Sequence, residues 1–188
     1  LLQKGNNMAI IGENGKGKST LLKTLVGTLE SLGGSFTIGN NVEWGYFDQQ
    51  KAVQDDADPE QTILDNFWEA YPKLVREEVR GALGGFLFSG EDVMKKMGQL
   101  SGGEKVRLSL CKIFKTLPNL LILDEPTTGL DPQTRKTLWN VISDLRKNEN
   151  MTVFLTTHYM EEAAEADYVV ILDSGKISAE GTPLELKN

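Results

Sequence analysis

A glycine-rich loop near the start of the chain carries the residues with the clearest chemistry. Gly12-Glu-Asn-Gly-Lys-Gly-Lys-Ser19 follows an apolar stretch and precedes residues typical of a helix. Glycines let backbone N–H groups close on phosphate oxygens, and the helix dipole favours the negative charge. Lys18 would reach the β- and γ-phosphates of a nucleotide, and the Ser19 hydroxyl would bind Mg²⁺. The predicted nucleotide-binding residues are Gly12, Asn14, Gly15, Gly17, Lys18, Ser19 and Thr20.

Two acidic residues stand where an apolar stretch ends in the second half of the chain. Leu120-Leu-Ile-Leu-Asp124-Glu125 has the pattern of a buried strand followed by carboxylates. In open α/β folds, ligands bind at the carboxyl ends of the strands. We predict that Asp124 holds Mg²⁺, through water, and that Glu125 orients and activates the water that attacks the γ-phosphate. Without the glycine-rich loop upstream, such acids would more often belong to a solvated loop.

His158 and Gln49 are candidates whose residue types alone say little. His158 is the single histidine and directly follows the predicted strand Thr152–Thr157, so its imidazole should lie at the same edge of the sheet, near the γ-phosphate. Taken alone, it would be a surface or capping histidine. Gln49 ends the stretch Trp44-Gly-Tyr-Phe-Asp48 and, taken alone, would be an ordinary polar loop residue.

The composition is that of an acidic chain with the length of one domain. It has 188 residues, 39% of them hydrophobic, a formal charge of −7 and a pI near 4.9. This length and apolar content are enough to bury a core. The acidic balance argues against the broad basic surface that binds nucleic acid without sequence preference, so any RNA contact would be local. The longest apolar runs are strand-sized and far from the ~20 residues of a membrane-spanning helix.

The single cysteine and the start of the chain bear on where the protein works. Cys111 cannot form an internal disulfide and lies in an apolar helical pattern, so we expect core packing in a reducing cytoplasm. The chain begins without an initiator Met, a basic leader or an apolar signal core, so nothing marks it for secretion. We expect that an amino-terminal piece, including strands of the fold, is missing.

Alternating strand-like and helical segments predict an α/β fold around a largely parallel sheet. The expected strands are 8–11, 35–38, 42–47, 120–123, 152–156 and 168–172. The expected helices are 19–29, 62–71, 75–83, 101–115, one starting at 132, and 160–166. Residues from about 51 to 100 would form a small helical lobe inserted in the core, and residues 1–188 a single domain. Ser101 with Glu104 matches a capping box, and Asp131 with Pro132 matches a helix cap and first turn.

These signals together resemble the ATP-binding-cassette (ABC) superfamily, in the right order and over nearly the whole chain. Gly12–Ser19 matches Walker A, Gln49 the Q-loop, and Ser101-Gly102-Gly103 the signature motif. Asp124 and Glu125 match Walker B with its catalytic glutamate, Leu130-Asp131 the D-loop, and His158 the switch histidine. The resemblance implies a P-loop NTPase core of the RecA-like type.

The resemblance also implies an enzyme that binds Mg-ATP and hydrolyses it as part of a pair. In this family two cassettes stack head to tail, and the signature residues of one face the γ-phosphate held by the other. Ser101, Gly102 and Gly103 would therefore bind the nucleotide of a partner cassette. Gln49 would be a metal ligand and a catalytic residue together with Glu125 and His158.

Two branches of the superfamily share the resemblance. Residues 1–126 resemble the ABC-F proteins, soluble paired cassettes that act at the ribosome, in Leu100-Ser-Gly-Gly-Glu-Lys-Val-Arg107 among other stretches. Residues 127–188 resemble ATP-binding subunits of drug exporters of the daunorubicin-resistance type, for instance in Thr156-Thr-His-Tyr-Met-Glu-Glu-Ala163. One hypothesis is a composite chain with its junction near Pro126.

Three functions stay open at this point. The chain could be the energy-coupling subunit of an exporter, bound to a membrane permease at the cytoplasmic face, or an ABC-F-type ATPase on the ribosome. It could also bind nucleotide without turnover. Cassettes usually carry an aromatic residue before the glycine-rich loop that stacks on adenine, and the residues before Gly12 include none. We therefore expect weakened ATP affinity and poor base selectivity.

Overall fold

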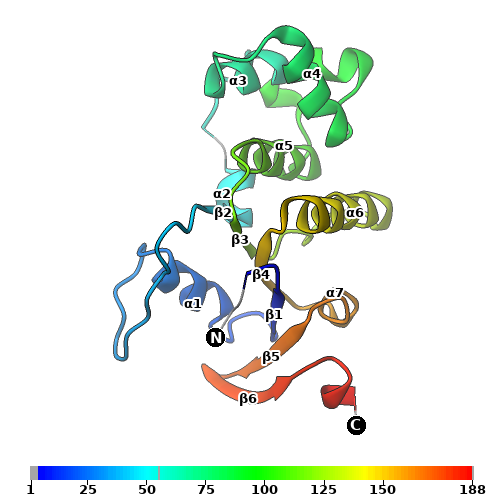
Figure 1. Ribbon diagram of the computed structural model, residues 1–188. Helices are drawn as coiled ribbons and strands as arrows, with labels where there is room; N and C mark the ends of the chain where they lie inside the picture. The colour runs from blue at the N-terminus through cyan, green and yellow to red at the C-terminus, as the bar shows by residue number, and fades with distance from the viewer. Residues whose placement is uncertain (1–3, 55, 188) are drawn as a thin grey trace. The chain divides into compact units, whose positions relative to one another are not determined.

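The computed structural model describes residues 4–54 and 56–187, which fall into two compact units (Figure 1). The first unit comprises Leu1–Asp48, Pro118–Pro126 and Leu145–Asn188, and the second comprises Gln49–Leu117 and Thr127–Asp144. The chain passes from the first unit to the second after Asp48 and again after Pro126. Both of these passages lie at or just beyond the end of a strand, Trp44–Asp48 and Leu120–Asp124.

The first unit is built on a sheet whose strands run mostly parallel. In the described residues the strands are β1 Asn7–Ile11, β2 Trp44–Asp48, β3 Leu120–Asp124, β4 Thr152–Thr157, β5 Tyr168–Asp173 and β6 Lys176–Gly181. Their order in the sheet is β2-β3-β4-β1-β5-β6, and only β6 pairs antiparallel, with β5, among the described strands. The predicted α/β fold with a largely parallel sheet is confirmed.

The strand register brings the polar strand ends to one edge. Asp48 pairs with Asp124, and Asp124 pairs with Thr156. Parallel strands present their carboxyl ends at the same edge, so the residues that end β2, β3 and β4 lie side by side. The loop after β1 opens at that edge too.

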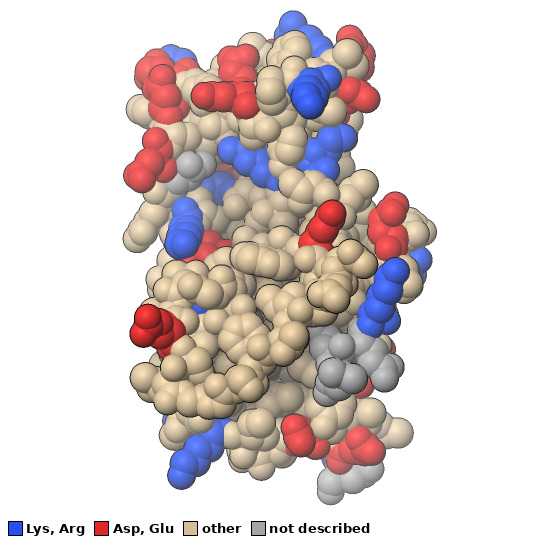
Figure 2. Space-filling view, turned by 60° about the vertical axis from the view of Figure 1, so that its left-hand side comes forward, with Lys and Arg blue, Asp and Glu red and all other residues tan. Residues whose placement is uncertain are grey.

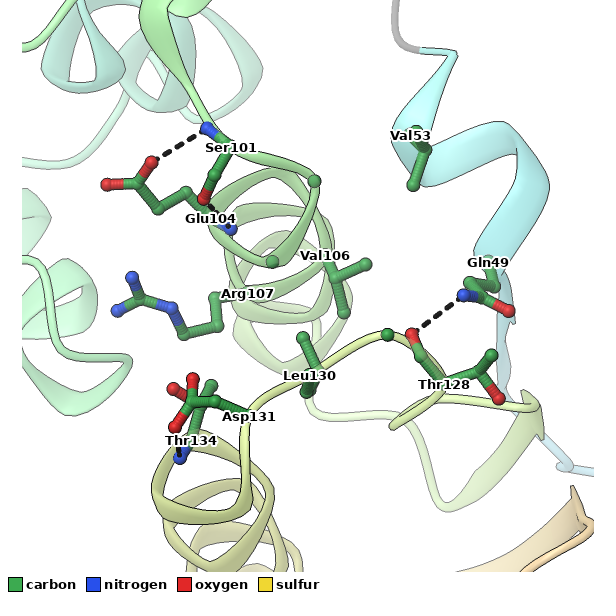
Figure 3. Close-up of a pocket in the computed structure, with 13 residues that line it drawn as sticks. Gln49, Val53, Ser101, Glu104, Val106, Arg107, Thr128, Leu130, Asp131 and Thr134 are labelled. Carbon is green, nitrogen blue, oxygen red and sulfur yellow. Dashed lines mark hydrogen bonds between the residues drawn. The ribbon is translucent and has the colours of Figure 1, made fainter.

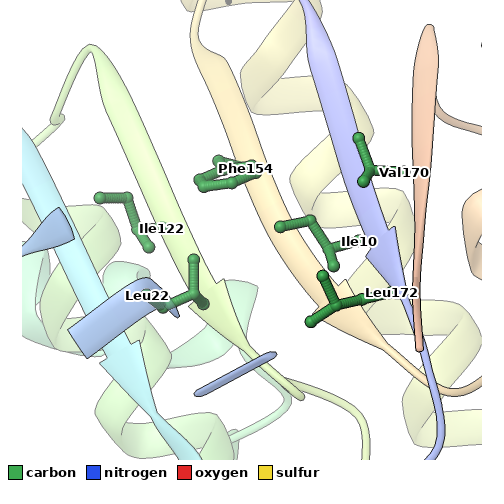
Figure 4. Close-up of a cluster of buried hydrophobic side chains, with 6 residues drawn as sticks. All are labelled: Ile10, Leu22, Ile122, Phe154, Val170 and Leu172. Carbon is green, nitrogen blue, oxygen red and sulfur yellow. The ribbon is translucent and has the colours of Figure 1, made fainter. Parts of the chain in front are cut away.

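An apolar cluster covers one face of the sheet in the first unit (Figure 4). Leu22 of α1, Lys18–Leu25, is fully buried and packs with side chains of β1, β3, β4 and β5. The members of the cluster are Ile10, Leu22, Ile122, Phe154, Val170 and Leu172. This burial fixes α1 on the sheet and hence the position of the loop that precedes it. The unit also contains α7, Met160–Ala163, and the 3-10 turn Glu185–Lys187.

The second unit is helical, with α5, Gly102–Lys115, packed against its other helices. These are α2 Gln49–Val53, α3 Ile63–Ala70 and α4 Arg76–Gly85, with 3-10 turns at Gly90–Met94 and Met97–Gln99. Phe114 of α5 stacks on Phe86 with ring centroids 5.4 Å apart. Cys111 is buried, as predicted, and burial raises the pKa of its thiol to about 12. The long helix α6, Pro132–Glu149, belongs to the second unit up to Asp144.

Several predicted elements differ from the structure. The helix predicted for 19–29 ends at Leu25, because Gly27 takes a φ of +76° and the N–H groups of Thr28 and Leu29 both bond to the Lys23 carbonyl. The strand predicted for 35–38 is wrong, since these residues find no strand partner among the described residues. The strand predicted for 42–47 runs from 44 to 48, the helix predicted for 160–166 ends at 163, and β6 was not predicted.

The cap predictions are confirmed. Ser101 Oγ accepts from the Glu104 N–H, and Glu104 Oε2 accepts from the Ser101 N–H at 2.8 Å. The Thr134 N–H donates to Asp131 Oδ1 at 3.0 Å at the start of α6. Within the residues described, no helix combines the length and the apolar character that crossing a membrane would take.

Candidate functional site

The glycine-rich loop lies between β1 and α1 in the first unit. Gly15 and Gly17 have φ values of +81° and +97°, a region that glycine enters at little cost. A Cβ on Gly12 would stand 2.5 Å from the Leu172 carbonyl oxygen, so this loop approaches β5 too closely for any side chain. The loop conformation therefore depends on glycine at these positions. The other predicted members, Asn14 and Thr20, are exposed.

The outer side of the loop is tied to the turn between β5 and β6. Lys16 Nζ lies 2.8 Å from Asp173 Oδ1, and the Gly175 N–H donates to the Lys16 carbonyl at 3.1 Å. The hydrogen bond to Asp173 raises the pKa of Lys16 and lowers the pKa of Asp173. Such a partly exposed ion pair contributes little stability. The backbone bond is therefore the more important part of this tie.

Lys18 is buried beneath the loop. Its Nζ donates to the carbonyls of Gly12 at 2.6 Å and Glu13 at 3.0 Å, and lies 3.0 Å from Glu125 Oε1. Only 3% of the Lys18 side chain and 16% of the Glu125 side chain is exposed. A buried ammonium with one carboxylate partner at this place can exchange that partner for another anion, such as a phosphate.

Ser19 and Asp124 form the oxygen-rich side of the site. Ser19 Oγ donates to Asp124 Oδ1 at 3.0 Å, and the same oxygen accepts from Thr156 Oγ1 at 2.7 Å. Burial raises the pKa of Asp124, against the effect of these two hydroxyls and with a smaller contribution from Asp48.

The oxygen atoms of the Ser19 hydroxyl and the Asp124 carboxylate fit Mg²⁺, which prefers hard oxygen ligands. The hydroxyl of Ser19 and the carboxylate of Asp124 are close enough to face one ion. Among the described residues, no group of three or more His, Cys, Asp or Glu could hold a metal ion. Mg²⁺ usually keeps several water ligands and takes phosphate oxygens of its substrate as others, so one hydroxyl and one carboxylate are a typical protein contribution.

Glu125 has an unusual backbone for a residue that follows a strand. Its φ is +50°, and its N–H donates to both the carbonyl and the hydroxyl of Thr156, at 3.2 and 3.1 Å. A non-glycine residue in this region is uncommon and costs free energy, so the bonds to Thr156 hold it there. Backbone strain of this kind is concentrated at functional sites.

His158 stands beside Glu125 on a firmly anchored turn. Its Nδ1 lies 4.0 Å from Glu125 Oε2. The turn is fixed by the buried Thr157 hydroxyl, which donates to Glu162 Oε2 at 2.6 Å and accepts from the Tyr159 N–H at 3.0 Å. The His158 ring also contacts the Tyr159 ring, with centroids 4.0 Å apart. His158 is thus held near the carboxylate without bonding to it directly.

Asp48 and Lys23 add a second link between α1 and the sheet edge. Lys23 Nζ lies 3.4 Å from Asp48 Oδ2, and Asp48 is buried next to Asp124 in the strand register. Lys23 follows Ser19 by one helical turn, so both face the sheet. Burial, with Asp48 and Asp124 adding to it, raises the pKa of Tyr46.

In the second unit, the start of α5 carries the predicted signature residues. Lys95 Nζ binds the capping Glu104 at 2.7 Å, and this bond helps to lower the pKa of Glu104 against the effect of burial. Gly102 has open space around its Cα, whereas a Cβ on Gly103 would stand 3.3 Å from Leu130. The α5 start thus presents backbone N–H groups and the Ser101 hydroxyl.

A hollow of about 390 Å³ opens beside the start of α5 in the second unit (Figure 3). It is lined by the start of α2, the start of α5 and the loop 128–131. Gln49 lies on its wall, and its Nε2 donates to the Thr128 carbonyl at 2.7 Å. Charged side chains of both signs, Arg107 and Asp131, line the hollow as well.

The predicted site residues are divided between the two units. The loop 12–20, Asp124, Glu125 and His158 come together in the first unit, while Gln49 and 101–103 come together in the second. Sequence reasoning missed Thr156, Lys23 and Asp48. Asp48 gave the same signal as Asp124, since it is an acid at the end of an apolar strand. Lys23 could have been found from its spacing of one turn after Ser19.

Comparison with known proteins gives one family for most of the chain. The family model described as "ABC transporter" matches residues 1–128. The protein YdiF of Bacillus subtilis (strain 168) is 46% identical over 144 residues, which are 77% of this chain and 22% of YdiF. The chain therefore spans about a fifth of the length of that relative.

A second relative is similar over more of its length. The energy-coupling factor transporter ATP-binding protein EcfA2 of Ligilactobacillus salivarius (strain UCC118) is 35% identical, covering 98% of this chain and 71% of EcfA2. The dimeric structure of the ATP-binding cassette MJ0796, in a post-hydrolysis state bound to ADP and Pi, superposes with a TM-score of 0.82. It covers 97% of this chain and 88% of that chain at 22% identity, and so it shows a shared fold.

Proposed function

The chain belongs to the ABC transporter family, and from this membership we propose that it binds Mg-ATP and hydrolyses it. The observation that carries the proposal is the close grouping of Lys18, Ser19, Asp124 and Glu125 at one edge of a parallel sheet. Together they supply the groups that phosphoryl transfer to water requires. Lys18 is a cation for the phosphates, the Ser19 hydroxyl and the Asp124 carboxylate can bind a metal ion, and the Glu125 carboxylate can act as a base.

In this proposal the loop and Lys18 bind the phosphates. Backbone N–H groups of residues 12–17 and the start of α1 would surround phosphate oxygens. A γ-phosphate oxygen would replace Glu125 as the anionic partner of Lys18, which frees the carboxylate for water. Ser19 and Asp124 would hold Mg²⁺, whose charge offsets the charge on the phosphates.

Glu125 is the proposed acceptor for the attacking water. Its carboxylate stands between Lys18 and His158, and its backbone is fixed by Thr156. A base must stand within hydrogen-bond reach of the proton it accepts, and a fixed backbone lowers the cost of reaching that geometry. His158 would orient Glu125 or the γ-phosphate from the other side.

The second unit would supply the complementary half of a site to another cassette. Ser101, Gly102 and Gly103 offer a hydroxyl and backbone N–H groups at the start of a long helix, which favours an anion. From the resemblance of Gln49 to the Q-loop glutamine of the family, we also propose Gln49 as a ligand of the metal ion. We propose that two cassettes pair head to tail with nucleotide in the interface, so that ATP binding and pairing stabilise each other.

The proposed biological role is the ATP-hydrolysing subunit of a membrane transporter, at its cytoplasmic face. The name of EcfA2, which places that protein in an energy-coupling factor transporter, supports this role. The alternative is an ABC-F-type ATPase on the ribosome, which the resemblance of residues 1–126 to ABC-F proteins favours. Sedimentation of the Mg-ATP-bound chain with purified ribosomes, compared with inverted membrane vesicles, separates the two.

The proposal is tested with Glu125→Gln, a change that keeps the shape of the side chain and removes the base. Light scattering on size-exclusion eluate should show a dimer with Mg-ATP and a monomer without it, because slow hydrolysis traps the paired state. Steady-state phosphate release should fall at least about 100-fold. Glu77→Gln, at an exposed position of α4, is the matched control and should leave both readouts unchanged. A persistent monomer at saturating ATP would instead support a cassette that binds nucleotide without turnover.

A further inference from the structure

The side-chain amide of Gln49 is oriented by a backbone carbonyl in the second unit. Its Nε2 donates to the Thr128 oxygen at 2.7 Å (Figure 3). A carbonyl oxygen only accepts hydrogen bonds, so the nitrogen end of the amide must face Thr128 and the oxygen end must point away. We propose that the Thr128 carbonyl is a positioning group, which determines that Gln49 presents its oxygen to a ligand.

This orientation matters because the two ends of an amide differ in what they bind. An amide oxygen can coordinate Mg²⁺, whereas an NH₂ group has no lone pair available for a metal ion. The inference rests on the proposed function, in which Gln49 is a metal ligand. Turning the amide by half a rotation would place two carbonyl oxygens against each other and lose the bond, so Thr128 selects the ligating orientation.

Gly129 sets the direction of the Thr128 carbonyl. The peptide plane that carries this carbonyl joins residues 128 and 129, and Gly129 has a φ of +78°. A Cβ at residue 129 would meet Gln49 Nε2 at 4.0 Å, an ordinary contact. Space therefore permits a side chain, and the requirement for glycine comes from the backbone conformation. A residue that avoids positive φ would rotate the peptide plane and move the acceptor away from Gln49.

The loop on the far side of Gly129 is held in place. The Leu130 N–H donates to the Thr127 carbonyl at 3.1 Å. The Leu130 side chain is 6% exposed and lies so close to Gly103 that a Cβ there would stand 3.3 Å from it. Because residues 127 and 130 are fixed, a change at residue 129 must be absorbed by the peptide that carries the Thr128 oxygen. This makes residue 129 a specific control point for the orientation of Gln49.

The test compares Gly129→Val with Gly129→Asn in the whole chain. Valine strongly disfavours a φ of +78°, and asparagine tolerates it. The first readout is solvent exchange of the Gln49 side-chain NH₂ in ¹⁵N-resolved NMR spectra, assigned with Gln49→Ala. The exposed Gln133 is the internal reference. We expect slowed exchange of Gln49 in the wild type and in Gly129→Asn, and exchange like that of Gln133 in Gly129→Val. Gly129→Ala replaces the valine variant if that variant does not fold.

The second readout is the affinity for Mn²⁺ in the presence of ADP, measured by electron paramagnetic resonance of free Mn²⁺. Gly129→Val should weaken it about 10-fold or more, as loss of a group that orients a ligand does. Gly129→Asn should stay near the wild type. Fast exchange of the Gln49 amide in the wild type would overturn the inference. Slowed exchange that Gly129→Val abolishes without any change in Mn²⁺ affinity would support the orienting bond and reject Gln49 as a metal ligand.

Discussion

The Thr156 hydroxyl connects two residues of the site, the Asp124 carboxylate and the Glu125 amide. Thr156→Val keeps the shape of the side chain and removes both bonds, which leaves buried polar groups with fewer partners. We expect the free energy of unfolding to fall by about 1–3 kcal/mol, together with a loss of ATPase activity. Urea denaturation measures the first effect. Thr116→Val removes an exposed hydroxyl bond at the end of α5 and should cost much less; equal costs would contradict the role given to Thr156.

Titration of the Asp124 carboxyl should also change how the free energy of unfolding depends on pH. Burial raises its pKa above 3.8, so the folded protein binds a proton there more readily than the unfolded chain. Stability from this group is therefore lost as the pH rises from the unfolded pKa through the folded pKa, and stays constant above it. Asp124→Asn removes that loss. The variant should gain stability relative to the wild type as the pH rises from 3.8 toward neutrality, in urea unfolding at a series of pH values. A constant difference across the series would refute the assigned shift.

At the residue scale, the sequence predicted those parts of the site that belong to short local motifs. The loop from Gly12 to Ser19 could be identified because its function requires fixed spacing along the chain. The Lys23–Asp48 pair joins α1 to β2, and no local spacing relates the two residues. The two hydrogen bonds of the Thr156 hydroxyl, to Asp124 and to the Glu125 N–H, likewise depend on the strand order in the sheet, which the sequence pattern does not contain.

At the scale of elements, matched cap variants separate stability from function. Ser101 caps α5 and Thr62 caps α3, each by accepting an N–H from the residue three positions later. Ser101→Ala and Thr62→Ala should each lower the free energy of unfolding by about 1 kcal/mol. Only Ser101→Ala should weaken ATP-dependent pairing, measured by light scattering in the Glu125→Gln background. Equal loss of pairing in both variants would mean that α5 contributes through its stability alone.

Helix α5 and the apolar strands β1, β3, β4 and β5 were predicted to within about one residue, whereas the expected strand 35–38 and the edge strand β6 were not. The range of α5 follows from the Ser101 cap and the apolar face of the helix. Residues 35–38 have the composition of a strand but pair with no strand in the described part of the chain. The edge strand β6 was missed because its residues, Lys176–Gly181, are mostly exposed and lack an apolar alternation.

At the scale of the whole molecule, acidic and basic side chains are interspersed on the face shown in Figure 2. The sequence-based argument against a broad basic surface for nucleic acid rests on the net charge of −7. Any contact of this chain with RNA would then depend on a local feature.

Pairing in trans gives the last prediction, because each chain carries two different half-sites. Lys18→Ala damages the half-site of the first unit, and Ser101→Arg blocks the half-site of the second. Either variant paired with itself has no intact site. A mixed dimer joins the intact Lys18 of one copy to the intact Ser101 of the other, which leaves one complete site.

Head-to-tail pairing therefore predicts that mixed dimers, co-expressed with two different tags and purified through both, recover about half of the wild-type ATPase activity. Dimers of Lys18→Ala carrying both tags are the control and should stay inactive. Mixed dimers that form but show no recovery would mean that the two half-sites do not meet across the interface.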